Sequence, residues 1–127
     1  MSSPVEVRTH LIWLEDDGIV RVKVKPNIEI SLQDAQAAIR AVSEVCGGKR
    51  YPALVDMRGL VGMDRGARLY FAGVETAKVE SAAALIIESP LSKAIGNFFM
   101  GLNKPIIPTR LFTSEEQAIA WLKGLGQ

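Results

Sequence analysis

The stretch that decides the fold is Ala53-Leu-Val-Asp-Met57, followed by a helical pattern from Asp64 to Ala77 and by the apolar run Ala82-Ala-Ala-Leu-Ile-Ile87. The first segment is predicted to be a short buried strand, and the last a strand that is apolar on both faces. Because a helix separates the two strands, they are expected to pair in parallel through a right-handed crossover. The middle of the chain therefore predicts an α/β fold whose sheet carries helices on at least one face.

Two more units follow toward the C-terminus. Ser89-Pro90 is a typical helix start, with serine as the N-cap and proline at the first helical position, and this helix is predicted to reach Leu102. Residues 106–112 are predicted to form the last strand, either at an edge of the sheet or with a bulge, because Pro108 interrupts its hydrogen bonding. Thr113-Ser-Glu-Glu116 is a capping box that predicts a final helix. From Ala53 onward the chain thus contains three strand-helix units.

The N-terminal part predicts an antiparallel hairpin and then a helix. Segments 5–14 and 19–25 alternate as strands do, and Asp17-Gly18 between them suits a tight turn. In this prediction the odd-numbered residues of segment 5–14 share the buried face with the even-numbered residues of segment 19–25. Residues 31–46 then repeat apolar side chains at helical spacing, with Ser31 as the N-cap.

Composition describes one ordinary globular domain. The 127 residues, 48% hydrophobic and 23% charged, suffice for one core without disulfides, so residues 1–127 are expected to form a single domain. With one cysteine and one histidine, the chain has no metal-site pattern; Cys46 is interpreted as a small apolar residue and His10 as a solvated one. The net charge of +1 gives no basic excess for binding nucleic acid. The N-terminus shows no signal-peptide pattern, so we expect a cytoplasmic protein.

The segment 53–67 resembles the signature of the STAS domains, the anti-sigma-factor antagonist family with the SpoIIAA-like fold. Asp56, Gly59, Leu60 and Asp64 match this signature without a gap, and the order of predicted elements agrees over nearly the whole chain. The resemblance implies a SpoIIAA-like mixed β-sheet, with an N-terminal β-hairpin followed by a helix and three strand-helix units. It also implies a bacterial regulatory protein that acts through protein-protein contacts.

One residue departs from the regulated members of that family. The resemblance implies a phosphorylatable serine or threonine directly after the position of Asp64, where this chain has Arg65. Arginine cannot form a phosphate ester, so a phosphorylation switch at this position is excluded. The chain therefore resembles a non-phosphorylatable variant with a fixed positive charge near a helix start. It is equally similar to small bacterial STAS- or Sec14-like proteins, for which the resemblance implies an apolar ligand or a membrane contact.

Two groups of residues are candidate sites. The first is an edge where helix starts and arginines are suited to an anion or an acidic partner, namely Arg58, Asp64, Arg65, Arg68 and Ser89. The alternative is that the caps only close their helices and the arginines pair with nearby carboxylates. The second group is apolar and is a candidate ligand pocket or interface, namely Tyr70, Phe71, Phe98, Phe99 and Met100. The alternative for this group is core packing together with a dimer contact.

We predict a non-enzymatic STAS-like binding or regulatory module that contacts a protein partner, or a second copy of itself, through segment 58–68 and the helix beginning at Ser89. The alternative is a small carrier of an apolar, lipid-like ligand between helices 64–77 and 89–102. An enzyme built around Asp56 and Asp64 is the third hypothesis. The sequence contains no glycine pattern for a phosphate or dinucleotide. We therefore expect neither a cofactor nor a metal, we expect no binding of nucleic acid, and a membrane contact is less favoured than a protein partner or an apolar ligand.

Overall fold

The computed structural model describes residues 2–125. Its main sheet has six strands in the spatial order β1 (Val5–Glu6), β2 (His10–Leu14), β3 (Val20–Val24), β5 (Tyr51–Asp56), β7 (Glu80–Ile86) and β8 (Thr109–Phe112). A separate pair of strands consists of β4 (Ile28–Ile30) and β6 (Leu60–Met63). The helices are α1 (Leu32–Val45), α2 (Arg65–Ala72), α3 (Val74–Ala77), α4 (Pro90–Phe98), the π-helix η1 (Phe99–Asn103) and α5 (Glu115–Leu125).

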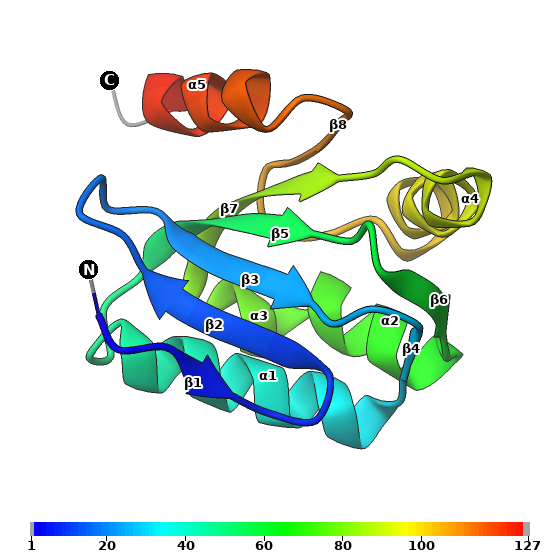
Figure 1. Cartoon of the computed structure of the whole chain (residues 1–127), viewed down its shortest axis with the longest axis horizontal. Coiled ribbons are helices and arrows are strands. Elements are labelled where there is room, and N and C mark those ends of the chain that lie inside the picture. Colours follow the sequence, from blue (N-terminus) through cyan, green and yellow to red (C-terminus); the bar gives the residue numbers. More distant parts are fainter. Residues whose placement is uncertain (1, 126–127) are drawn as a thin grey trace.

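These elements form three layers with the main sheet in the middle (Figure 1). Helices α1, α2 and α3 lie on one face of the sheet, and α5 lies on the other. Strands β1, β2 and β3 pair antiparallel, whereas β3, β5, β7 and β8 pair in parallel. The mixed sheet with an N-terminal hairpin, a helix and three strand-helix units is therefore confirmed. Strand β8, which follows Pro108, stands at the predicted edge.

The N-terminal hairpin differs from its prediction in one respect. Segment 5–14 is not a single strand, because the chain reverses after β1 and the Val7 amide donates to the His10 carbonyl at 3.0 Å. His10 pairs with Val24 and Ile12 with Val22, so the even-numbered residues of β2 share the buried face with β3. The predicted odd-numbered face is wrong, since the reversal interrupts the alternation on which it was based.

Helix α1 forms as predicted, behind a capping box. The Ser31 hydroxyl accepts a hydrogen bond from the Asp34 amide at 3.3 Å, and the Asp34 carboxylate accepts one from the Ser31 amide at 2.9 Å. Arg8, in the turn between β1 and β2, donates to both Asp34 oxygens at 2.9 and 2.6 Å. This side chain therefore connects the N-terminal hairpin to the start of α1.

The second half contains more elements than the sequence predicted. Strand β6, which pairs with β4 outside the main sheet, lies between β5 and α2. The predicted helix 64–77 is divided at Gly73 into α2 and α3, and the last turns of the predicted helix 89–102 form η1. Strand β8 begins at Thr109 instead of residue 106.

Gly59 lies where two chain segments come close together. A Cβ atom at this position would be 2.7 Å from the Lys25 carbonyl oxygen, which belongs to the backbone between β3 and β4. Only glycine leaves room for that approach. The glycine of the Asp56-x-x-Gly59-Leu60 segment thus allows the β4–β6 pair to form beside the main sheet.

Candidate ligand-binding pocket

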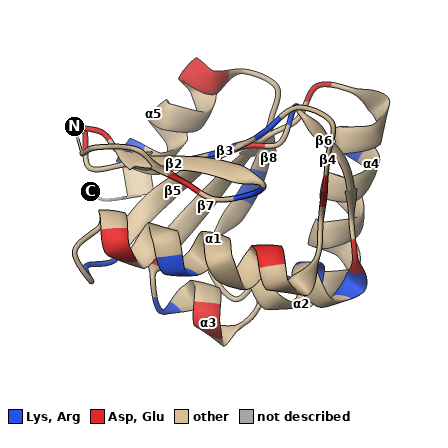
Figure 2. Ribbon diagram, turned by 60° about the horizontal axis from the view of Figure 1, so that its bottom comes forward, with Lys and Arg blue, Asp and Glu red and all other residues tan. Residues whose placement is uncertain are grey.

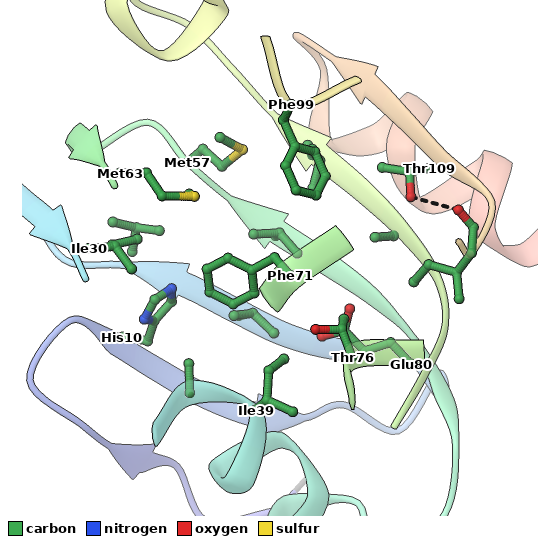
Figure 3. Close-up of a pocket in the computed structure, with 17 residues that line it drawn as sticks. His10, Ile30, Ile39, Met57, Met63, Phe71, Thr76, Glu80, Phe99 and Thr109 are labelled. Carbon is green, nitrogen blue, oxygen red and sulfur yellow. Dashed lines mark hydrogen bonds between the residues drawn. The ribbon is translucent and has the colours of Figure 1, made fainter. Parts of the chain in front are cut away.

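An internal pocket lies between the main sheet and the helical layer formed by α1, α2 and α3 (Figure 3). Its volume is about 60 Å³. Most of its lining is aliphatic, aromatic or thioether, and four polar side chains interrupt this surface. The lining residues are His10, Val22, Val24, Ile30, Ala38, Ile39, Val55, Met57, Met63, Phe71, Thr76, Glu80, Ala83, Leu85, Phe99, Ile107 and Thr109.

Glu80 reaches this pocket because of an irregularity in strand pairing. Strand β5 advances from Tyr51 to Ala53 while β7 advances from Glu80 to Ala83, one residue more. Strict alternation would place Glu80 with Ala82, Ala84 and Ile86, which pack under α5. The extra residue is a β-bulge, which changes the direction in which the preceding side chains point. Glu80 therefore lines the pocket together with Ala83 and Leu85.

The Glu80 carboxyl is buried and has no partner. The residue is 4% exposed, and no hydrogen bond or ion pair connects its side chain to any other residue between 2 and 125. Burial without a compensating charge raises the pKa of Glu80 to about 8. Glu80 is therefore mainly a neutral carboxylic acid at pH 7 and has one O–H group to donate.

His10 is the second buried titratable group of the pocket. It is 1% exposed, so its predicted solvent exposure is wrong. Its Nδ1 lies 2.6 Å from the Thr9 hydroxyl oxygen, and its ring meets Phe71 edge-on, with ring centroids 6.3 Å apart. Burial lowers the pKa of His10 to about 4. The imidazole is therefore neutral at pH 7, and the pocket contains two titratable groups that are both uncharged.

The predicted aromatic group is divided between the pocket and the surface. Phe71 and Phe99 line the pocket, and Phe99 enters it from η1. Tyr70 and Met100 pack against the same core without lining the pocket. Phe98 is 48% exposed.

Most residues of the predicted anion edge form hydrogen bonds with neighbouring residues of the chain. Arg58 donates to both oxygens of Asp56, at 2.9 and 2.8 Å. The Ser89 hydroxyl accepts from the Ser92 amide at 3.0 Å, and Asp64 accepts from the Ala67 amide at 2.8 Å. Ser89 and Asp64 thus cap their helices, and Asp56 pairs with Arg58.

Arg65 and Arg68 lie at the start of α2. Arg65 is the first residue of that helix and is exposed, which confirms the predicted cation at a helix start. Arg68 donates from Nη1 to the Met63 carbonyl at 2.6 Å, and its guanidinium carbon lies 4.9 Å from the centre of the Phe98 ring. Strand β6, which pairs with β4 outside the main sheet, lies between β5 and α2 in the chain, so α2 does not follow a strand of the main sheet directly.

Charge is spread evenly over the molecule. Basic and acidic residues are interspersed along the ribbon (Figure 2). Between residues 2 and 125, no group of three or more His, Cys, Asp or Glu side chains is placed to hold a metal ion. No helix in the same range is long and apolar enough to cross a membrane.

None of the four polar residues that line the pocket was predicted as a site residue. Glu80 precedes the apolar run that begins at Ala82, and an acidic residue so close to a buried strand was the available signal. His10 was assigned to the wrong face, and Thr76 was placed in a continuous helix. Their convergence depends on a bulge and a helix break that periodicity does not show.

Comparison with known proteins supports the fold and gives a family. No curated protein matches the sequence. An uncharacterised DUF3478-family protein with a SpoIIAA-like fold, from Shewanella loihica PV-4, is similar over 96% of this chain and 98% of its own, with a TM-score of 0.60 and 22% identity. This likeness confirms the predicted SpoIIAA-like fold. A protein of unknown function from Arthrobacter sp. FB24 is 36% identical over 88% of this chain and 97% of its own, with a TM-score of 0.35. A family model described as a domain of unknown function, DUF7793, matches residues 12–125, and the chain therefore belongs to the DUF7793 family.

Proposed function

We propose that this protein is a binding module for a small apolar molecule, held in the pocket between the main sheet and helices α1 to α3. The observation that carries the proposal is the cavity of about 60 Å³ with its largely apolar lining. Protein interiors are close-packed, and empty space larger than a water molecule is uncommon in them. An apolar cavity with a few convergent polar groups is the usual form of a small-molecule site. The proposed role is binding without catalysis.

The volume limits the size of the ligand. A cavity of this size corresponds to roughly four water molecules, at about 15 Å³ for each. A compact molecule such as a five-membered carbon ring is of this order, whereas a long acyl chain is much larger. We therefore favour a small compact ligand over the lipid-like ligand that the sequence suggests.

Titration with methylcyclopentane, followed through the methyl resonances of the protein, tests this proposal. We expect saturable shifts of Val22, Ile39 and Leu85, which line the pocket. Shifts confined to surface methyl groups, or none up to the solubility limit of the hydrocarbon, would contradict the proposal.

A cavity-filling variant gives the matched control. Ala83→Val adds two methyl groups at the pocket wall and is expected to weaken methylcyclopentane binding about tenfold or more, because it occupies space that the ligand needs. Ala120→Val makes the same change at an exposed position of α5 and should leave binding unchanged. Equal affinity in both variants, with both folded, would place the ligand elsewhere.

A second candidate function is contact with a protein partner at what we call the α2–η1 surface. It consists of five exposed apolar residues, Leu69, Val74, Phe98, Leu102 and Ile106. The hydrogen bond from the Ile106 amide to the Ala72 carbonyl, at 3.1 Å, and the stacking of Arg68 on Phe98 hold these elements together. Leu102 is 65% exposed, which favours an interface over core packing.

Charge introduced into this surface tests the second candidate. Leu102→Glu, within this surface, and Arg65→Glu, at the start of the adjoining helix α2, are expected to abolish capture of a partner or, if the partner is a second copy, to shift the mass measured by light scattering to that of a monomer. Leu125→Glu makes a similar change on α5, which lies across the sheet from α2, and should have no effect. Unchanged association of all three variants would exclude the α2–η1 surface.

A further inference from the structure

The pocket contains one polar group whose hydrogen-bonding capacity no other residue uses. The Thr76 hydroxyl donates to the Tyr70 carbonyl at 2.9 Å, and the Thr109 hydroxyl donates to the Ile107 carbonyl at 2.9 Å. His10 has the Thr9 hydroxyl beside its Nδ1. Glu80 alone among these four lining side chains has no hydrogen-bond partner between residues 2 and 125.

Thr76 and Glu80 both line the pocket with a polar side chain. Figure 3 shows their oxygen atoms close together in the view, with Phe71 and His10 farther along the lining. Because the Thr76 hydroxyl uses its proton on Tyr70, its oxygen still offers acceptor capacity to a neighbour. The pocket lining therefore offers a donor from Glu80 and an acceptor from Thr76, whereas Phe71, Phe99 and Leu85 present only apolar surface.

A buried carboxyl without a partner is costly, and a ligand can remove that cost. An unmade hydrogen bond in an apolar site destabilises the folded protein, and a bare charge there is costlier still. A carbonyl or hydroxyl oxygen on the ligand accepts the Glu80 proton without creating a charge. A cationic ligand would have to lose its hydration and ionise Glu80, and an anionic ligand would find no cation, since no lining residue is lysine or arginine.

We infer that the ligand of this pocket is a small, uncharged, compact compound with one carbonyl or hydroxyl oxygen, bound by a hydrogen bond from Glu80. This inference rests on the proposed function, since it requires that the pocket be a binding site. It adds the class of ligand and the residue that selects it.

Three probes of equal size distinguish an apolar, a neutral polar and a cationic ligand. They are methylcyclopentane, cyclopentanone and cyclopentylammonium. They have the same ring and differ only in the group attached to it, which is apolar, a neutral acceptor or a cation. Titration of the intact protein with each, followed by the methyl resonances of the pocket, is expected to show cyclopentanone binding about tenfold more tightly than methylcyclopentane. Cyclopentylammonium is expected to bind most weakly.

Two substitutions of Glu80 identify the anchoring group. Glu80→Gln keeps a donor at the same place and should retain the preference for cyclopentanone. Glu80→Leu removes the donor and should lower the affinity for cyclopentanone to that for methylcyclopentane, while methylcyclopentane still binds. Glu116→Gln changes an exposed carboxylate on α5 and should leave all three affinities unchanged.

The outcomes distinguish this inference from the proposed function. If none of the three probes shifts the pocket resonances, the proposed function fails and the inference with it. If methylcyclopentane binds as tightly as cyclopentanone, the pocket is a binding site but Glu80 does not select the ligand. Tightest binding by cyclopentylammonium would likewise overturn the inference, since it would make the anchor a carboxylate that prefers a cation.

Discussion

Glu80 determines part of how the stability of this protein depends on pH. Its pKa is about 8 in the folded protein against an ordinary value of 4.5, so between these values the folded state holds a proton that the unfolded state has lost. The free energy of unfolding therefore falls as the pH rises from about 4.5 to 8, and the loss is complete above 8.

Glu80→Gln removes this titration. The variant is expected to resemble the wild type at pH 4 and to be more stable by on the order of 3 kcal/mol at pH 9, because only the wild type must then bury a charge. Urea unfolding of both proteins across this range measures the difference. A difference that does not change with pH would show that the Glu80 carboxyl is hydrated in the folded protein.

Asp34 makes the opposite contribution. The hydrogen bond from Arg8, opposed by burial and supported by Ser31, holds the pKa of Asp34 well below its ordinary value of 3.8. The stability it contributes is therefore present above about pH 4 and is lost as the pH falls below that value. We expect Asp34→Ala to lower the free energy of unfolding by about 1–2 kcal/mol at pH 7.

Arg8→Ala is the matched comparison for Asp34→Ala. The Arg8 side chain is 62% exposed, so solvent screens its ion pair and its loss should cost less stability than the loss of Asp34. Equal effects of the two substitutions in urea unfolding at pH 7 would mean that the capping box adds nothing beyond the ion pair.

Among the connections between elements, the one at Gly59 is the most sensitive to a single added atom. Gly59→Ala would place a Cβ 2.7 Å from the Lys25 carbonyl, so the β4–β6 pair would have to move. We expect a loss of about 2 kcal/mol or more. Gly124→Ala, in α5, meets nothing within 4 Å and should be neutral or stabilise by a few tenths of a kcal/mol. Thermal unfolding compares the two, and a stable Gly59→Ala protein would contradict the close approach.

The helices and the parallel strands were predictable from local patterns. Ser31, Asp64 and Ser89 all cap the helices that they were expected to begin, because capping depends on a few consecutive residues. The β4–β6 pair was not predictable, since it joins segments far apart in the chain. Neither was the orientation of β2, where a reversal after β1 shifts the alternation.

The pocket was predictable only in part, and for a similar reason. Phe71 and Phe99 were identified because an aromatic pair on each helix is visible in the sequence. Glu80 was not identified, because the bulge between β5 and β7 turns its side chain to the face opposite the one that strand alternation predicts. The extra residue has no signature in composition or periodicity, so only the three-dimensional pairing shows it.

For the molecule as a whole, the SpoIIAA-like fold supplies a sheet with helices on both faces, and the two faces differ. The face under α5 is filled by small and aliphatic side chains such as Ala84, Ile86 and Leu122. The face under α1 to α3 contains the cavity and the buried Glu80. The binding role is therefore expected on one face only, and the other face serves stability.

The most direct test of this account is a crystal structure of the protein grown with cyclopentanone. We predict one molecule in the pocket, its ring against Phe71 and Phe99 and its oxygen within hydrogen-bonding distance of the Glu80 carboxyl. A pocket closed by rearranged side chains, or a ketone bound only at the surface, would contradict the claim that this protein binds a small uncharged ligand between its sheet and its helices.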